Sequence, residues 1–112
     1  MDSRLLSGTV EMMVLHVVSL EPTYGYEITQ EVLRRSQGCF ELKEGSLYPA
    51  LHKLERNGLL ESYWVDVQEA RRRKYYRITA EGAKALARKR VEWRGFSTAV
   101  NGVLGARHHA LA

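Results

Sequence analysis

The sequence contains four consecutive cations whose chemistry suggests a partner: Arg71, Arg72, Arg73 and Lys74. Residues 67–80 hold five basic side chains and one acidic one, whereas residues 1–66 hold six basic and ten acidic side chains. The positive charge therefore lies in this short segment and in residues 81–112, which hold six basic and two acidic side chains. Cations on an edge strand can also block aggregation, but four in succession exceed that need. The cluster predicts a surface that binds nucleic-acid phosphates.

A second group of candidates shares one face of a helix predicted over residues 46–57. Its apolar residues form a single stripe, which comprises Leu47, Ala50, Leu51 and Leu54. In a DNA-recognition helix, the first side chains of the other face reach base edges and later cations contact phosphates. Taken alone, this helix fits an ordinary solvated face equally well. The DNA interpretation gives four candidates on or beside the helix face and one just before the helix: Ser46, Tyr48, Pro49, Lys53 and Lys43.

Two tyrosines flank the start of another predicted helix, over residues 24–37. Tyr24 and Tyr26 surround Gly25, and the N–H groups at a helix N-terminus together with a tyrosine hydroxyl suit a phosphate oxygen. Alternatively, Tyr24 belongs to the core and Gly25 only permits a tight start. The two interpretations are compatible, so Tyr24 and Tyr26 join the DNA-binding candidates.

The sequence offers little for catalysis or metal binding. No Ser/His/Asp or Cys/His arrangement has supporting context, and no glycine-rich phosphate loop is present. The pair His108-His109 is a weak metal signal without further ligands, and His16 lies among apolar residues as a core histidine would. The single cysteine, Cys39, fits a small buried or half-buried apolar residue better than a reactive thiol. We expect no enzymatic activity, no metal and no cofactor.

The elements that position the candidates follow from hydrophobic spacing. Apolar residues at helical intervals predict helices over residues 9–20, 24–37, 46–57 and from Thr79 to about Leu104. The first would be capped by Ser7 or Thr9 and the third by Gly45 or Ser46, with Pro49 in or beside its first turn. Aromatic and β-branched residues predict strands over 59–67 and 74–79, and residues 40–42 could form a brief strand. The connection 68–73 is polar and longer than a tight turn, so we expect a mobile tip.

This order of elements predicts an α+β fold, mostly α, of the winged helix-turn-helix type. Three helices precede a two-stranded wing, and a long C-terminal helix follows. We expect a winged-helix domain at residues 1–80, a dimerisation helix at 81–105 and a flexible tail at 106–112. The N-terminus has no long apolar segment and the longest apolar run, residues 12–18, cannot span a bilayer. A cytoplasmic protein without membrane contact is therefore expected.

The last helix carries more apolar surface than a small domain can cover by itself. The residues concerned are Leu86, Trp93, Phe96, Val100 and Leu104. A second copy of the chain would cover them as a dimer core. A sharper alternative is that two symmetry-related Trp93 rings line a pocket for a flat apolar ligand, whereas spacing alone favours simple packing.

Several motifs together resemble one known family. They are Gly25-Tyr26-Glu27-Ile28, the segment from Glu44 to Leu51 (EGSLYPAL), the segment from Leu54 to Leu60 (LERNGLL) and the wing from Arg72 to Thr79 (RRKYYRIT) followed by Gly82. This combination resembles the DNA-binding domain of PadR regulators and extends from about Leu5 to Leu104.

The resemblance implies a homodimeric repressor of the short, single-domain kind that ends in one dimerisation helix. Trp93 resembles in position a tryptophan that stacks on planar drugs at the dimer centre of multidrug-responsive relatives. The expected partners are double-stranded DNA with a palindromic operator, a second copy of the chain and a small planar aromatic effector that relieves repression. The alternative is a winged-helix module that binds an acidic protein.

Overall fold

The computed structural model describes residues 3–105 and confirms the predicted fold class. Seven elements follow in chain order: α1 (Ser3–Leu20), β1 (Thr23–Tyr24), α2 (Gly25–Arg35), α3 (Glu44–Arg56), β2 (Leu60–Gln68), β3 (Arg71–Ile78) and α4 (Ala80–Leu104). The predicted tail and the pair His108-His109 lie outside the described residues. None of the described helices is long and apolar enough to cross a membrane.

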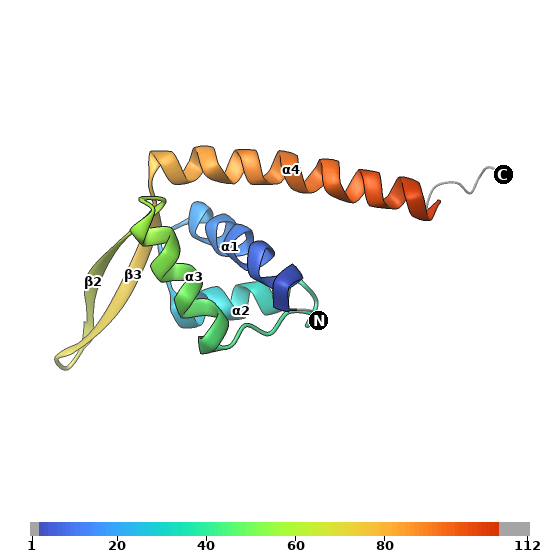
Figure 1. Ribbon diagram of the computed structural model, residues 1–112. Helices are drawn as coiled ribbons and strands as arrows, with labels where there is room; N and C mark the ends of the chain where they lie inside the picture. Colours follow the sequence, from blue (N-terminus) through green and yellow to red (C-terminus); the bar gives the residue numbers. More distant parts are fainter. Residues whose placement is uncertain (1–2, 106–112) are drawn as a thin grey trace.

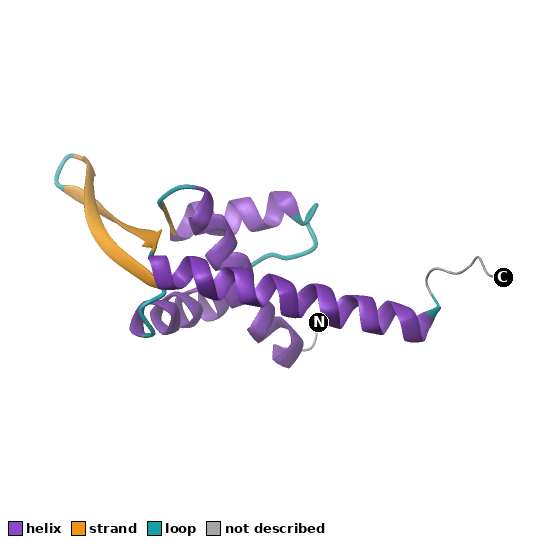
Figure 2. Ribbon diagram, turned by 90° about the horizontal axis from the view of Figure 1, so that it is seen from above, coloured by secondary structure: helices purple, strands orange, loops and turns teal. Residues whose placement is uncertain are grey.

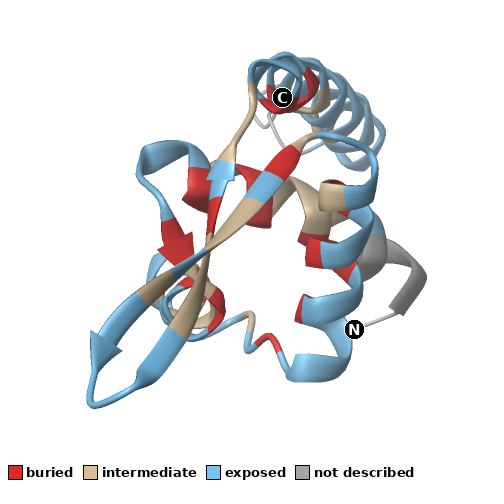
Figure 3. Ribbon diagram, turned by 90° about the vertical axis from the view of Figure 1, so that its left-hand side faces the viewer, coloured by how far each residue is buried: buried red, intermediate tan, exposed pale blue. Residues whose placement is uncertain are grey.

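The core lies where α1, α2 and α3 meet, beside the base of the sheet and below the first half of α4 in Figure 1. Helix α1 contributes Val14 and Leu15, which are fully buried, and it packs against both other helices. The apolar stripe of α3 faces inward while its other face stays exposed, as Figure 3 shows by the alternation of buried and exposed segments. Each such leucine stabilises the fold by roughly 1.5–3 kcal/mol, so the stripe fixes how α3 is presented to solvent.

The wing is a three-stranded antiparallel sheet in the order β1-β3-β2. Strands β2 and β3 pair from Leu60↔Ile78 to Gln68↔Arg71, with a bulge at Val67. The loop between them is only Glu69-Ala70, and both residues have positive φ, 46° and 64°, as a two-residue type I′ turn requires. The expectation of a longer loop at 68–73 is therefore wrong, and the four cations lie on strand β3 itself.

Helix α4 begins on the body and then leaves it. The Thr79 hydroxyl caps it by accepting from the N–H of Gly82 at 2.9 Å, and Ala85 and Leu86 are buried near its start. Its 25 residues make a rod of about 37 Å. In Figures 1 and 2 its second half extends past the three-helix body, and its apolar side chains Phe96, Val103 and Leu104 are exposed.

Several local expectations are corrected. Helix α1 begins at Ser3, before the proposed caps, and α3 begins at Glu44 after Lys43, so Ser46 is not its cap. Pro49 then falls in the second turn, where it removes a backbone donor from an exposed part of the helix. Residues 40–43 form no strand, and Cys39 is exposed.

Strand β1 was not predicted, because two residues following a proline carry no periodic signal. It pairs with β3 through Thr23↔Tyr76 and Tyr24↔Tyr75. The pairing brings the start of α2 beside the wing, and this places the two predicted phosphate-binding elements next to each other.

Candidate nucleic-acid interface

A groove of about 490 Å³, lined by tyrosines and cations, lies between the N-terminus of α2, the exposed face of α3 and strand β3. Its lining unites residues from all three elements: Tyr24, Gly25, Tyr26, Tyr48, Arg72, Arg73, Lys74 and Tyr76. Six of these are predicted DNA-binding residues. Segments separated by almost fifty residues therefore form one cationic surface.

Gly25 of α2 and Tyr48 of α3 lie close together in this groove. A Cβ added to Gly25 would lie 3.1 Å from the Tyr48 hydroxyl and 3.4 Å from Leu47 Cδ2. A side chain at position 25 would therefore displace the Tyr48 ring by a few tenths of an ångström. The N-cap residue Tyr24 supplies no side-chain cap to α2. First-turn N–H groups and a tyrosine hydroxyl are therefore gathered at one point, which suits an anion.

The wing cations divide between the two faces of β3, because successive side chains of a strand point to opposite sides. Arg72 stacks over the ring of Trp64 with its guanidinium carbon 5.0 Å from the ring centroid, and Lys74 lies 6.0 Å from the same ring. Arg73 faces the other way and lies 4.0 Å over Tyr24. Aromatic faces attract and orient such cations. Trp64, which the sequence reasoning did not select, is opposite Lys74 in the register.

The three cations that line the groove are not neutralised by ion pairs within the described chain. Among the described residues, no ion pair involves Arg72, Arg73 or Lys74. By contrast, Arg77 on the same strand bonds to Glu61 at 2.7 Å. The unpaired cations leave a positive surface that can exchange solution counterions for phosphates.

Other predicted residues lie apart from the groove. Lys53 pairs with Glu11 of α1 at 3.1 Å, and Lys43 lies 3.5 Å from Glu41. Ser46 and Pro49 are exposed on α3, where they can meet a base edge. Arg71 is exposed at the start of β3 next to the turn. The structure thus separates the cationic groove from the exposed surface of α3.

Tyr76 anchors the wing to the body. Its side chain is buried in the core, and burial, followed by the nearby charge of Glu55 and the neighbouring Tyr48, raises the pKa of its phenol. Glu55 in turn accepts a hydrogen bond from Ser62 of β2 at 2.5 Å. The phenol therefore stays neutral at physiological pH and holds the wing against α3.

The exposed apolar surface of α4 does not extend to the start of the helix, although the sequence predicts that it does. Leu86 is 6% exposed and packs in the core, so its assignment to exposed surface is wrong. Trp93, Phe96 and Leu104 are 46%, 56% and 73% exposed. The rings of Trp93 and Phe96 lie with centroids 6.0 Å apart. An exposed apolar row of this kind is typical of a protein contact.

Comparison with known proteins gives consistent matches. The model of the Transcriptional regulator PadR-like family matches residues 14–88. The transcriptional regulator Rv3488 of Mycobacterium tuberculosis is 35% identical over 102 residues, which are 91% of this chain and 89% of that protein.

Solved structures resemble the whole fold. A transcriptional regulator from Clostridium thermocellum has a TM-score of 0.82 and 34% identity over 91% of this chain and 96% of its own. A PadR family transcription regulator from Clostridium difficile has a TM-score of 0.74 and 37% identity over 86% and 98% of the two chains.

Proposed function

This chain belongs to the PadR-like family of transcriptional regulators, and we propose that it is a cytoplasmic homodimeric repressor with a two-fold symmetric operator. Residues 1–80 form the DNA-binding unit of this proposal and residues 81–105 its dimerisation helix. The observation that carries the proposal is the groove in which the N-terminus of α2, Tyr48 and three unpaired cations of β3 meet.

In this proposal the groove would contact the phosphates of the DNA and the exposed face of α3 would contact its bases. A phosphate in it would accept from the first N–H groups of α2 and the Tyr48 hydroxyl, and would be attracted by Arg72, Arg73 and Lys74. With the backbone fixed in this way, the exposed first turns of α3 enter the major groove. Ser46 and Pro49 are then the side chains in a position to contact base edges.

Dimerisation would follow from the exposed row on α4. Pairing of two such helices covers Trp93, Phe96, Val100 and Leu104 and relates the two α3 helices by a two-fold axis. Half-sites about one helical turn apart, ~34 Å, would then be read together. A planar aromatic effector stacking on Trp93 near this axis would favour a different spacing of the α3 helices and release the operator.

Selection of bound fragments from genomic DNA with the purified chain tests the proposal. We expect one palindromic site to be enriched, with an affinity that falls steeply as salt rises. A transcription assay on a promoter holding that site should show less transcript when the protein is added. Recovery of random fragments only, or binding that salt does not weaken, would instead favour a winged-helix module for an acidic protein partner.

The dimer is tested separately by sedimentation. The full chain should sediment as a dimer, whereas Phe96→Asp, which places a charge in the proposed interface, should give a monomer. Asn101→Asp, also exposed on α4 but polar already, serves as the control. A Phe96→Asp variant that remains dimeric would remove α4 from the interface.

A further inference from the structure

Trp64 of strand β2 is 56% exposed, although it lies on the face of the wing that turns toward α3. The strand register identifies this face, because residues directly opposite each other across a sheet share one face. Ser62 and Tyr76 form the next pair on that face toward the body. The Ser62 hydroxyl donates to Glu55 of α3 at 2.5 Å, and the Tyr76 side chain is buried in the core. The exposed indole ring therefore stands on the same side of the wing as α3 and remains open to a partner.

Two cations of β3 lie over this ring. The guanidinium carbon of Arg72 is 5.0 Å from the ring centroid, and the Lys74 ammonium is 6.0 Å from it. Lys74 is directly opposite Trp64 in the register, and Arg72 is the next residue of β3 on the same face. Both cations line the cationic groove, whereas Trp64 itself does not. Any influence of the ring on the groove is therefore exerted through these two side chains.

Arg72 lies over the ring rather than pairing with the carboxylate opposite it. Asp66 is its partner in the register, yet no ion pair or hydrogen bond engages Arg72 within the described part of the chain. Contact with an aromatic face restricts a guanidinium without occupying its N–H donors with a competing acceptor. The donors of Arg72 are thus left free to meet phosphate oxygens in pairs.

Long cationic side chains lose rotamer freedom when they bind DNA, and this loss weakens binding. A ring that restricts Arg72 and Lys74 before DNA arrives makes the loss smaller. We propose that Trp64 is a positioning residue for DNA binding, which holds these two cations where they meet the phosphate backbone. The inference rests on the proposed function, because it takes the cationic groove to be the surface that binds phosphates.

Removal of the ring should lower the affinity for DNA without removing a phosphate contact. An exposed cation–π contact corresponds to about a two- to fivefold change in affinity, so a dimer with two wings should lose about four- to twenty-fivefold. Phosphate contacts carry no sequence information, so a random-sequence duplex should show this loss as clearly as an operator. The slope of log K against log salt should stay that of the parent chain, since the cations at the phosphates are unchanged.

Fluorescence anisotropy with a labelled random-sequence duplex measures both quantities. Trp64→Leu should show the full loss, and Trp64→Phe, which keeps an aromatic face of weaker attraction, should show a smaller one. In an Arg72→Gln chain, Trp64→Leu should lose most of its effect, because the cation nearer the ring is gone.

Tyr63→Leu is the matched control. The Tyr63 ring lies on the opposite face of the wing, 4.7 Å from the guanidinium carbon of Arg77, and neither residue lines the groove. Its replacement removes a cation–π contact of the same kind and should leave the affinity unchanged. Thermal melting followed by circular dichroism checks that each variant is folded.

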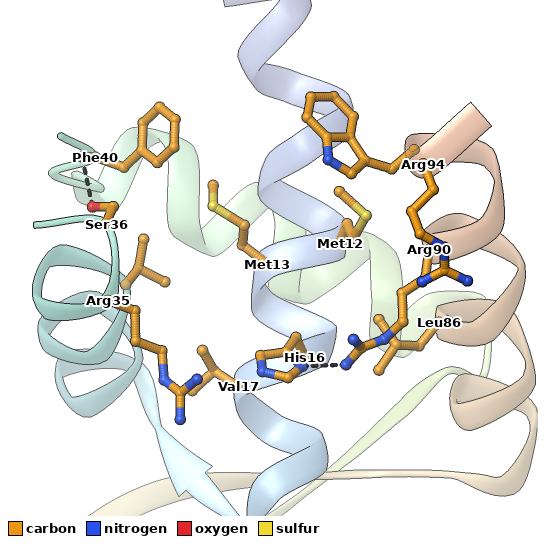
Figure 4. A pocket seen from close by; sticks show the side chains of 12 residues that line it. Met12, Met13, His16, Val17, Arg35, Ser36, Phe40, Leu86, Arg90 and Arg94 are labelled. Carbon is orange, nitrogen blue, oxygen red and sulfur yellow. Dashed lines mark hydrogen bonds between the residues drawn. The ribbon is translucent and has the colours of Figure 1, made fainter. Parts of the chain in front are cut away.

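A second readout follows the Trp64 ring itself. The chain has two tryptophans, and the other, Trp93, lines a groove between α1, α2 and α4 to which the wing contributes no residue (Figure 4). In a Trp93→Phe chain, the indole emission therefore comes from Trp64 alone. It should change when unlabelled duplex is added and recover at high salt, which a ring that only supports the hairpin would not show.

Three results would overturn the inference: a Trp64→Leu variant that binds as tightly as the parent, a loss that is undiminished in the Arg72→Gln chain, or a Trp64 emission that DNA does not alter. A parent chain that binds no duplex at all would overturn the proposed function as well. Tight binding by the parent and by Trp64→Leu alike would overturn the role of Trp64 alone.

Discussion

If the groove on β3 binds DNA as proposed, its sharpest consequence concerns how strongly added salt weakens DNA binding in variants of the wing. Arg72 and Arg73 line the groove from opposite faces of β3 and make no ion pair within the described chain. Each phosphate contact contributes about 0.9 to the slope of log K against log salt. A homodimer carries two wings, so either single change to Gln should make the slope shallower by about 1.8.

Fluorescence anisotropy with labelled operator and with random DNA, over a range of potassium chloride concentrations, measures these slopes. The two DNAs should lose affinity alike, because phosphate contacts carry no sequence information. Arg77→Gln is the control, because Arg77 lies on the same strand but is engaged by Glu61 outside the groove. A slope that stays unchanged in both groove variants, or falls equally in Arg77→Gln, would refute the assignment of the wing.

Three further outcomes follow from the geometry. Gly25→Ala should weaken binding to all DNA while changing the free energy of unfolding by less than about 1 kcal/mol, because the new Cβ meets the Tyr48 hydroxyl at 3.1 Å; equal anisotropy curves would contradict this. Gly82→Ala should destabilise the fold by about 3 kcal/mol in urea, because its Cβ would lie 2.1 Å from a backbone carbonyl oxygen. Gly95→Ala, with open space in the same helix, should instead stabilise it by up to about 1 kcal/mol. Partial burial, followed by the charges of Arg90 and Arg35, lowers the pKa of His16. The folded state then binds fewer protons, so the free energy of unfolding should decrease as pH falls below the ordinary value of 6.5. His16→Gln should lack that part of the decrease, and a pH profile identical to the parent would exclude His16 as its source.

Features set by local periodicity could be predicted from the sequence. The spacing of Leu47, Leu51 and Leu54 determines which face of α3 is buried, and their burial matches it. The succession of three helices, two strands and a helix is read from the same kind of pattern, and it is confirmed except for the additional short strand β1. The cations at residues 71–74 are visible in any composition scan, although their distribution over two faces of a strand is not.

Features set by tertiary contacts could not be predicted in this way. The turn Glu69-Ala70 has two residues with positive φ, and neither residue type signals such a turn. Lys53 could equally well contact solvent, DNA or a carboxylate until α1 is packed beside it. Leu86 and Trp93 continue one apolar pattern, and only the point at which α4 leaves the body separates a core residue from an exposed one.

The contacts that hold the first turn of α4 explain how a change in the orientation of α4 would be transmitted to the proposed DNA-binding surface. The Thr79 hydroxyl donates to the carbonyl of Gly58 at 2.7 Å, and the Thr79 N–H donates to the carbonyl of Leu59 at 3.1 Å. Gly82 packs so closely on Leu59 that a side chain cannot fit between them. The first turn of α4 is therefore fixed to the segment that directly follows α3. If two chains pair through α4 as proposed, a rotation of α4 would be transmitted through this connection to α3. The angle between the two α4 helices would then set the distance between the two α3 helices, and a ligand that changed this angle would change DNA binding.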